Sequence, residues 1–69
     1  MKITLDKDAD AMYIEMSNEA FAKNKKIDGE TIIDLDKEGK IIGIEILNVS
    51  KRMHKDFLSN ISFQNLATN

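Results

Sequence analysis

Residues 27–48, IDGETIIDLDKEGKIIGIEILN, contain two runs rich in isoleucine on either side of a short polar segment. In each run, side chains of one kind recur at every second position, which is the period of a β-strand. The polar segment ends in Gly39, which tolerates the positive φ at which such a turn closes. The sequence therefore predicts a β-hairpin here. Gly43, inside the second run, is expected to mark a bulge or a close approach by another backbone.

The N-terminal part of the chain shows the same alternation twice. Residues 2–6 and residues 11–17 both alternate between two kinds of side chain, so each predicts a strand. The short polar segment between them suits a hairpin loop. Residues 18–26 have no clear period, and we expect a connection there, anchored on the core by Phe21.

From Ser50 onward, the spacing of the apolar residues changes to that of a helix. Met53, Phe57 and Ile61 lie four residues apart, which places them on one helical stripe. Ser50 is the expected N-cap, because a serine that precedes such a stripe can satisfy a free backbone N–H. The sequence thus predicts an α-helix over about residues 50–66.

Together these elements predict an α+β fold, an antiparallel four-stranded β-sheet with one C-terminal α-helix packed on one face. The expected strands are residues 2–6, 11–17, 31–36 and 40–47. We expect a single domain over residues 1–69, with the sheet in residues 1–48. Its core should form where the apolar side chains of the sheet meet those of the helix. The sheet contributes Met12, Ile14, Ile33, Leu35, Ile42, Ile44 and Ile46, and the helix contributes Met53, Phe57 and Ile61.

The second face of the predicted sheet is only partly polar. Four apolar side chains lie on it beside acidic neighbours, and these are Tyr13, Ile32, Ile41 and Leu47. A chain of 69 residues has a marginal core, and this one has no cysteine to form a disulfide. We therefore expect a homodimer whose interface uses these four residues or the open edge of the strand at residues 2–6.

The composition argues against several classes of function. The net charge is −2 with a pI near 5.2, whereas a protein that binds nucleic acid needs a basic face. No apolar run approaches the ~20 residues of a membrane span, and the N-terminus MKITLD does not resemble a signal peptide. We expect a cytoplasmic protein that binds neither nucleic acid nor membrane. Without cysteine, and with His54 as the single histidine, thiolate and two-histidine metal sites are excluded.

Two longer stretches match a known pattern. Residues 5–17, LDKDADAMYIEMS, and residues 27–53, IDGETIIDLDKEGKIIGIEILNVSKRM, closely resemble the small prokaryotic domain-of-unknown-function family number two-two-eight-three. The matching residues are Asp6, Ala9, Asp10, Ala11, Tyr13 and Ile14 in the first stretch, and Asp34, Asp36, Gly39, Gly43, Ile44, Glu45, Ile46, Leu47 and Ser50 in the second. The departures are Leu5 in place of tyrosine, Asp8 in place of glutamate, and Asn48-Val49 in place of Asp-Ala.

The resemblance spans residues 3 to about 53 and implies no established activity. Some members of that family are encoded beside small toxin-like proteins. The resemblance therefore implies an antitoxin-like role in which the chain binds a small protein partner.

The acidic residues of the predicted hairpin also fit a calcium-loop pattern. The ligand positions 1, 3, 5 and 12 of such a loop fall on Asp34, Asp36, Glu38 and Glu45, with a glycine at position 6. Calcium loops of this kind are flanked by helices, whereas predicted strands flank this one. A hairpin turn also explains the same residues, because turns favour acidic side chains and glycine. A divalent-cation site at these four carboxylates is therefore an open alternative.

No arrangement typical of an enzyme is visible in the sequence. It lacks a glycine-rich phosphate loop, and its single histidine does not belong to a recognisable catalytic triad. We predict a self-associating protein-interaction domain rather than an enzyme, with no catalytic residue and no cofactor. A second alternative is a small enzyme that is active only as an oligomer, for which Asp10, Tyr13 and Glu45 are the candidate residues.

Overall fold

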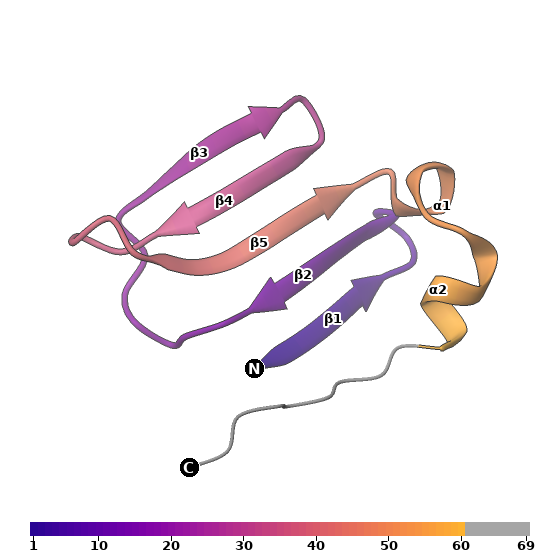
Figure 1. Cartoon of the computed structure of the whole chain (residues 1–69), viewed down its shortest axis with the longest axis horizontal. Coiled ribbons are helices and arrows are strands. Elements are labelled where there is room, and N and C mark those ends of the chain that lie inside the picture. The colour runs from indigo at the N-terminus through magenta and orange to yellow at the C-terminus, as the bar shows by residue number, and fades with distance from the viewer. Residues whose placement is uncertain (61–69) are drawn as a thin grey trace, which may run out of the picture.

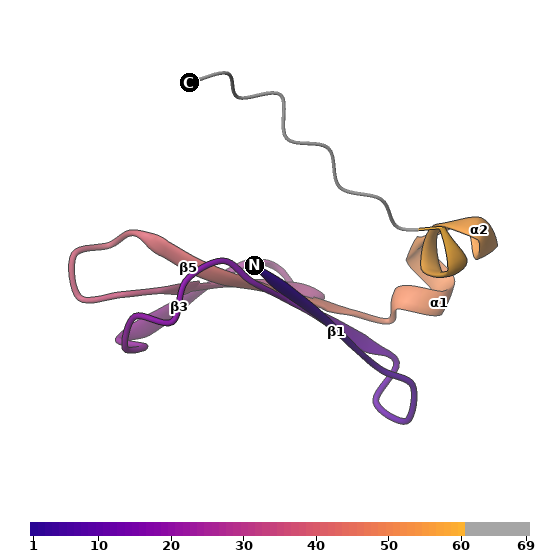
Figure 2. The ribbon, with the colours of Figure 1, turned by 90° about the horizontal axis from the view of Figure 1, so that it is seen from below.

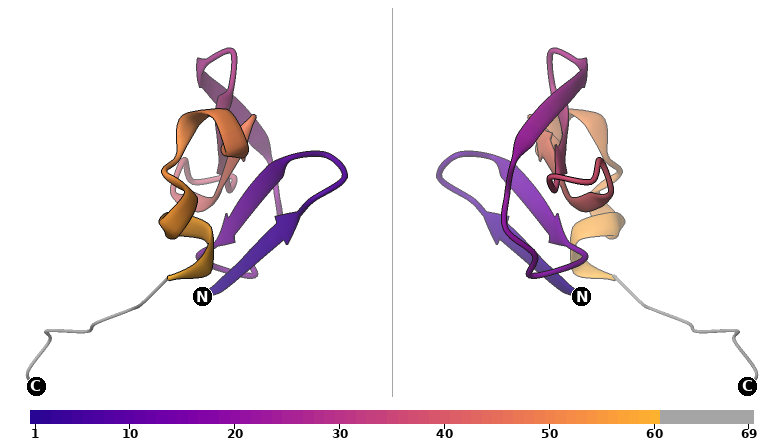
Figure 3. Two further views of the ribbon diagram at one scale, coloured as in Figure 1. Left: turned by 90° about the vertical axis from the view of Figure 1, so that its right-hand side faces the viewer. Right: turned by 90° about the vertical axis from the view of Figure 1, so that its left-hand side faces the viewer.

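The computed structural model describes residues 1–60, and these form one antiparallel β-sheet followed by two short helices (Figure 1). The five strands lie in the order β1-β2-β5-β4-β3 across the sheet. In chain order the elements are β1 (Lys2–Asp6), β2 (Ala11–Glu15), β3 (Lys23–Asp28), β4 (Thr31–Leu35), β5 (Ile41–Leu47), α1 (Val49–Arg52) and α2 (Lys55–Ser59). The end-on views in Figure 3 show the twist of the sheet between the β1–β2 and β3–β4 hairpins.

Four of the strands confirm the alternation seen in the sequence. β1, β2, β4 and β5 lie where the period of two predicts them, and the hairpin of β4 and β5 forms the middle of the sheet. Its turn is organised by Asp36, a buried side chain whose Oδ1 accepts hydrogen bonds from the backbone N–H groups of Glu38 and Lys40, both at 2.9 Å. Gly39 has a φ of 83°, the positive value expected for it. Acidic residues at this turn therefore have a structural use.

The prediction of a connection at residues 18–26 is wrong in its second half. Residues 23–28 form β3, an edge strand that pairs along β4 from Lys23 opposite Leu35 to Asp28 opposite Thr31. Every residue of β3 is exposed, so the strand shows no alternation of buried and exposed side chains, and its backbone pairs along β4. Phe21 does not anchor this segment, since 57% of its surface is exposed.

The single C-terminal helix predicted for residues 50–66 is also wrong over its described part. α1 ends at Arg52 after one turn, Met53 and His54 are extended, and α2 is a second short turn. The N-cap is Asn48 in the left-handed conformation rather than Ser50. Figure 2 shows α1 and α2 beyond the end of β5 rather than over the middle of the sheet. The predicted positions after residue 60, including Ile61, lie outside the described residues.

The two faces of the sheet differ in chemistry. Cross-strand pairs align one set of side chains, which we call the isoleucine face: Ile3, Leu5, Met12, Ile14, Ile33, Ile44 and Ile46. The opposite set is the tyrosine face: Lys2, Thr4, Tyr13, Glu15, Ile32, Asp34, Glu45 and Leu47. Among the apolar side chains whose burial the structure describes, those of Met12, Ile42 and Val49 are the buried ones. Much of the predicted core is therefore half-buried rather than enclosed.

Candidate functional site

Tyr13 is the central side chain of the tyrosine face. It pairs with Glu45 on β5 and with Thr4 on β1, and its ring lies over Gly43. A Cβ at position 43 would overlap the Tyr13 hydroxyl and ring, so this glycine provides the space in which the tyrosine lies. The close approach expected at Gly43 is therefore made by a side chain rather than by another backbone. The bulge expected as the alternative also has a counterpart, because the ladder becomes irregular directly after the pair of Asp34 and Gly43.

Three carboxylates act on the phenol of Tyr13. Burial raises the pKa of Tyr13 above its ordinary value of 10.0, and a hydrogen bond with Asp34 raises it further, as do the charges of Asp34, Glu15 and Glu45. Each effect favours the neutral phenol, because the phenolate would add a fourth negative charge at the same place. The raised pKa therefore keeps the phenol of Tyr13 protonated, which makes it a poor nucleophile.

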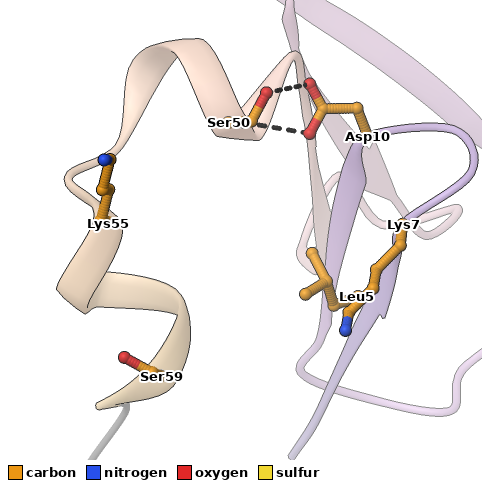
Figure 4. Close-up of a pocket in the computed structure, with 6 residues that line it drawn as sticks. All are labelled: Leu5, Lys7, Asp10, Ser50, Lys55 and Ser59. Atoms are coloured by element: carbon orange, nitrogen blue, oxygen red, sulfur yellow. Dashed lines mark hydrogen bonds between the residues drawn. The ribbon is translucent and has the colours of Figure 1, made fainter.

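A second group of polar side chains attaches α1 to the end of the sheet. Ser50 donates to both oxygens of the Asp10 carboxylate, from its backbone N–H at 3.0 Å and from its hydroxyl at 2.7 Å (Figure 4). Asp10 has a φ of 53°, and its backbone oxygen accepts from the Val49 N–H at 3.1 Å. These contacts join the loop before β2 to the segment after β5, so Asp10 has a role in the fold.

Arg52 completes this attachment from the other side. Its Nη1 donates to the backbone oxygens of Glu30 at 2.6 Å and Leu47 at 3.2 Å, and its Nη2 donates to the Thr31 hydroxyl at 2.7 Å. Asn48 adds a hydrogen bond to the Glu30 carboxylate. The sequence did not indicate this arrangement, because a lone arginine among polar residues carries no periodic signal.

The comparison with family models places the chain. A model described as "Protein of unknown function (DUF2283)" matches residues 2–50. The chain belongs to the DUF2283 family. This confirms the resemblance drawn from the sequence, and no match was found among curated proteins or among solved structures.

The DUF2283 match begins with β1 and ends at Ser50, in the first turn of α1. Several of the residues that carried the resemblance contact one another in the structure. Asp10 binds Ser50, and Tyr13 lies over Gly43 beside Asp34. In this DUF2283 chain, the pattern therefore describes contacts that hold the sheet together.

The four carboxylates of the predicted cation site have different surroundings. Asp34 and Glu45 share the tyrosine face, where Asp34 pairs with Gly43 and Glu45 pairs with Ile32. Asp36 serves the turn, and the exposed Glu38 lies 3.9 Å from the ammonium of Lys40. Within residues 1–60, no three side chains of the metal-binding types are grouped closely enough to hold an ion. The divalent-cation site stays a prediction, with two of its members on a common face.

The candidate residues of the enzyme alternative are only partly together. Tyr13 and Glu45 both line a hollow of about 270 Å³ on the tyrosine face, together with Thr4 and Asp6. Asp10 instead lines a hollow of about 680 Å³ between α2 and the β1–β2 hairpin (Figure 4). Since Ser50 already occupies both oxygens of Asp10, this carboxylate is not free to act with Tyr13.

The four residues of the predicted interface also separate. Tyr13, Ile32 and Leu47 lie on the tyrosine face by their pairing. The ladder between β4 and β5 is irregular between Asp34 and Leu35, and Ile41 pairs with Leu35. Ile41 therefore does not follow the alternation that predicted it on the same face as the other three residues. Ile41 is 48% exposed at the edge of this irregularity.

The isoleucine face is an extended apolar surface of the described sheet. Its central side chains, Ile14, Ile33 and Ile44, are half-buried, and Ile3 near its margin is 40% exposed. α1 and α2 lie beyond the end of the sheet and leave the middle of this face without a second layer from residues 1–60 (Figure 2). No helix in this part of the chain is long and apolar enough to cross a membrane.

Proposed function

We propose that this protein is an interaction domain that self-associates through the isoleucine face. The observation that carries the proposal is the single layer formed by residues 1–60. A stable domain buries the apolar side of a sheet against a second layer. Here α1 and α2 do not provide that layer over Ile14, Ile33 and Ile44.

The energetic gain from covering this face is large for so small a chain. Fully burying an isoleucine side chain is worth about 1.5–3 kcal/mol relative to exposure, so completing the burial of several half-buried ones contributes a few kcal/mol. Total stabilities of small proteins are about 5–15 kcal/mol. Leaving the face open would therefore forgo a sizeable part of the stability that a chain of 69 residues can reach.

A second copy of the chain is the partner that matches this surface best. The middle of the face is apolar, so it is complementary to another apolar face rather than to a charged ligand. Two identical faces related by a twofold axis complement each other without a further component. Sheets that pack in this way lie about 10 Å apart, with strands within about 30° of each other.

The size of the face indicates how strong this contact is. Five strands about 4.8 Å apart, each with about five residues of 3.3 Å, give a flat projection of about 400 Å². Partners in a standard-size interface contribute about 800 Å² each. Even with the relief of the side chains added, one face contact lies at the small end of stable interfaces.

A matched pair of variants on β4 tests the proposal. Ile33 and Ile32 are adjacent and half-buried but point to opposite faces. Sedimentation velocity over a dilution series should show that the natural sequence associates, that Ile33→Lys lowers the mass, and that Ile32→Lys does not. Circular dichroism verifies that both variants retain the sheet. A monomeric natural sequence at about 100 μM would overturn the proposal.

The reverse outcome has a specific meaning. If Ile32→Lys lowers the mass and Ile33→Lys does not, the interface lies on the tyrosine face. That result would support the interface predicted from sequence at Tyr13, Ile32 and Leu47. The small protein partner implied by the family resemblance and the cytoplasmic location stay predictions.

A further inference from the structure

The two edges of the sheet are protected to different degrees. β3 carries Lys23, Lys25 and Lys26, and its ladder shifts between Lys26 and Asp28. Charged lysines and irregular register are the features by which natural edge strands discourage further pairing. β1 at the other edge has one lysine and a regular five-pair ladder to β2. Among the described residues, no strand pairs with the outer side of β1.

The sequence of β1, KITLD, is complementary to itself when reversed. If two copies pair antiparallel about Thr4, Lys2 lies opposite Asp6 of the second copy and Ile3 lies opposite its Leu5. Thr4 then lies opposite Thr4. Opposite charges, threonine pairs and apolar pairs are the cross-strand combinations that stabilise an antiparallel ladder.

Other registers lose these matches. If one strand slides by one residue, Ile3 lies opposite Thr4. The isoleucine face of one copy is then on the same side as the tyrosine face of the other. A shift by two keeps the faces aligned but pairs fewer residues and separates Lys2 from Asp6. The register centred on Thr4 pairs all five residues of β1 and joins both charge pairs.

We propose that β1 pairs antiparallel with β1 of a second copy, with the twofold axis at Thr4. This contact rests on the proposed self-association and names a second surface for it, distinct from the centre of the isoleucine face. Lys2 and Asp6 lie on the tyrosine side of β1, so the two symmetric charge pairs form away from the apolar surface.

The edge contact also enlarges the apolar face. Ile3 and Leu5 lie on the isoleucine face, so pairing brings them beside Leu5 and Ile3 of the second copy in one continuous surface. The combined sheet has ten strands, and its flat apolar projection doubles to about 800 Å². Two such sheets stacked face to face would reach the area of a standard-size interface, which leads to a tetramer with two kinds of contact.

Single-cysteine variants test the register, because the chain has no cysteine of its own. At the twofold centre, the α-carbons of the two Thr4 residues would lie about 4.5–5.5 Å apart, within the range that a disulfide spans. Thr4→Cys should therefore form a covalent dimer under mild oxidation. Lys2→Cys is the matched control, since the two copies of residue 2 would lie four residues apart in the ladder, about 13 Å.

The expected result is a dimer yield at least tenfold higher for Thr4→Cys than for Lys2→Cys, at equal concentration and with unchanged circular dichroism. Equal yields, or no dimer from either variant, would overturn the β1 contact. Sedimentation of the Ile33→Lys and Ile32→Lys pair separates this failure from failure of the face contact. A natural sequence that associates and responds to Ile33→Lys, with no Thr4→Cys dimer, would remove the edge contact alone.

Discussion

Tyr13 lies across Gly43 on the neighbouring strand, and its hydroxyl occupies the space that a β-carbon at position 43 would need. Glycine in the interior of a strand is unfavourable by about 0.5–1 kcal/mol relative to alanine, so its presence needs a reason. The reason here is the ring of Tyr13, which reaches Asp34 over a flat, side-chain-free position. The pair thus couples β2 to β4 across β5.

Replacing Gly43 by alanine should destabilise the fold. The new methyl group overlaps the Tyr13 ring, so Tyr13 must swing away and lose its hydrogen bond with Asp34. Overpacking of this kind costs about 1–3 kcal/mol, more than the gain in strand propensity. Urea unfolding followed by circular dichroism measures the change.

Gly29→Ala is the control for this substitution. A β-carbon at position 29 meets no atom within 4 Å, and its conformation is one that alanine accepts. Its unfolding midpoint should stay close to that of the natural sequence. Equal losses at positions 29 and 43 would contradict the role assigned to Tyr13.

The ionisation of Tyr13 should be measurable directly, because it is the single tyrosine and the chain has no tryptophan. Burial, Asp34 and the neighbouring glutamates hold its pKa above 10.0 in the folded protein. The folded state then keeps its proton more tightly than the unfolded state, so this contribution to stability is complete below pH 10 and is lost as pH rises through the folded pKa. Absorbance of the phenolate against pH gives the folded value.

Asp34→Asn should lower the pKa of Tyr13 towards 10.0, although burial, the largest cause, remains. Glu38→Gln, in the exposed turn of the β4–β5 hairpin, is the control and should leave the titration unchanged. A Tyr13 pKa that is the same in the natural protein and in Asp34→Asn would show that the carboxylate does not act on the phenol.

The strands were predictable where residue types alternate along the chain, and less so elsewhere. β5 carries isoleucine at positions 42, 44 and 46, and β4 carries Ile33 and Leu35 two residues apart, so their period was legible. β3 carries only exposed side chains, and its pairing with β4 is a property of backbone groups that the sequence does not display. An edge strand made of lysine, asparagine and aspartate with a single isoleucine, Ile27, therefore has nearly the composition of a loop.

The prediction of a single C-terminal helix was wrong for a different reason. The spacing of Met53 and Phe57 is helical, but Arg52 is held to the sheet by three hydrogen bonds. The chain turns away after that anchor, and Met53 is extended. Helices of four or five residues are far below the ~12–15 at which a helix is marginally stable alone, so tertiary contacts decide where they end.

The candidate site was also only partly predictable from the sequence. Gly43, inside a strand, indicated a close approach. The group that approaches it is the ring of Tyr13, a residue that we predicted to lie in a dimer interface. The carboxylates that matched a calcium loop are shared between a hairpin turn and the tyrosine face. Spacing along the chain did not distinguish a calcium loop from a hairpin turn, because the turn at Asp36 and Gly39 uses the same residue types as a calcium loop.

Calcium should leave the stability of the protein unchanged. Of the four predicted ligands, Asp36 is buried and accepts two backbone hydrogen bonds, and Glu38 lies beside Lys40. The measurement is thermal unfolding with and without about 5 mM CaCl₂. A cation present at a hundred times its Kd would add about 2.7 kcal/mol, so a clear rise in Tm would support the cation site.

Asp36→Ala should destabilise the protein in either buffer. Two backbone N–H groups of the turn lose their acceptor, at a cost of about 1–3 kcal/mol for groups that stay shielded from water. Lys37→Ala, an exposed neighbour in the same turn, should have little effect. If the two variants unfold at the same urea concentration, Asp36 does not organise the hairpin.

Arg52→Met should release α1 from the end of the sheet. The guanidinium donates to two backbone oxygens and to the Thr31 hydroxyl, three acceptors that a methionine cannot satisfy. Hydrogen bonds from a charged group contribute about 1.5–3 kcal/mol each at most, and exposure reduces this to about 1–2 kcal/mol for the set. Hydrogen exchange should accelerate at the Met53 amide, which bonds to the Val49 oxygen, and remain slow at Ile14 in the middle of the sheet. Lys51→Met is the control, because it removes a charge from the same turn but no hydrogen bond to the sheet. If exchange at the Met53 amide is accelerated equally in both variants, the charge and not the contacts of Arg52 holds α1 in place.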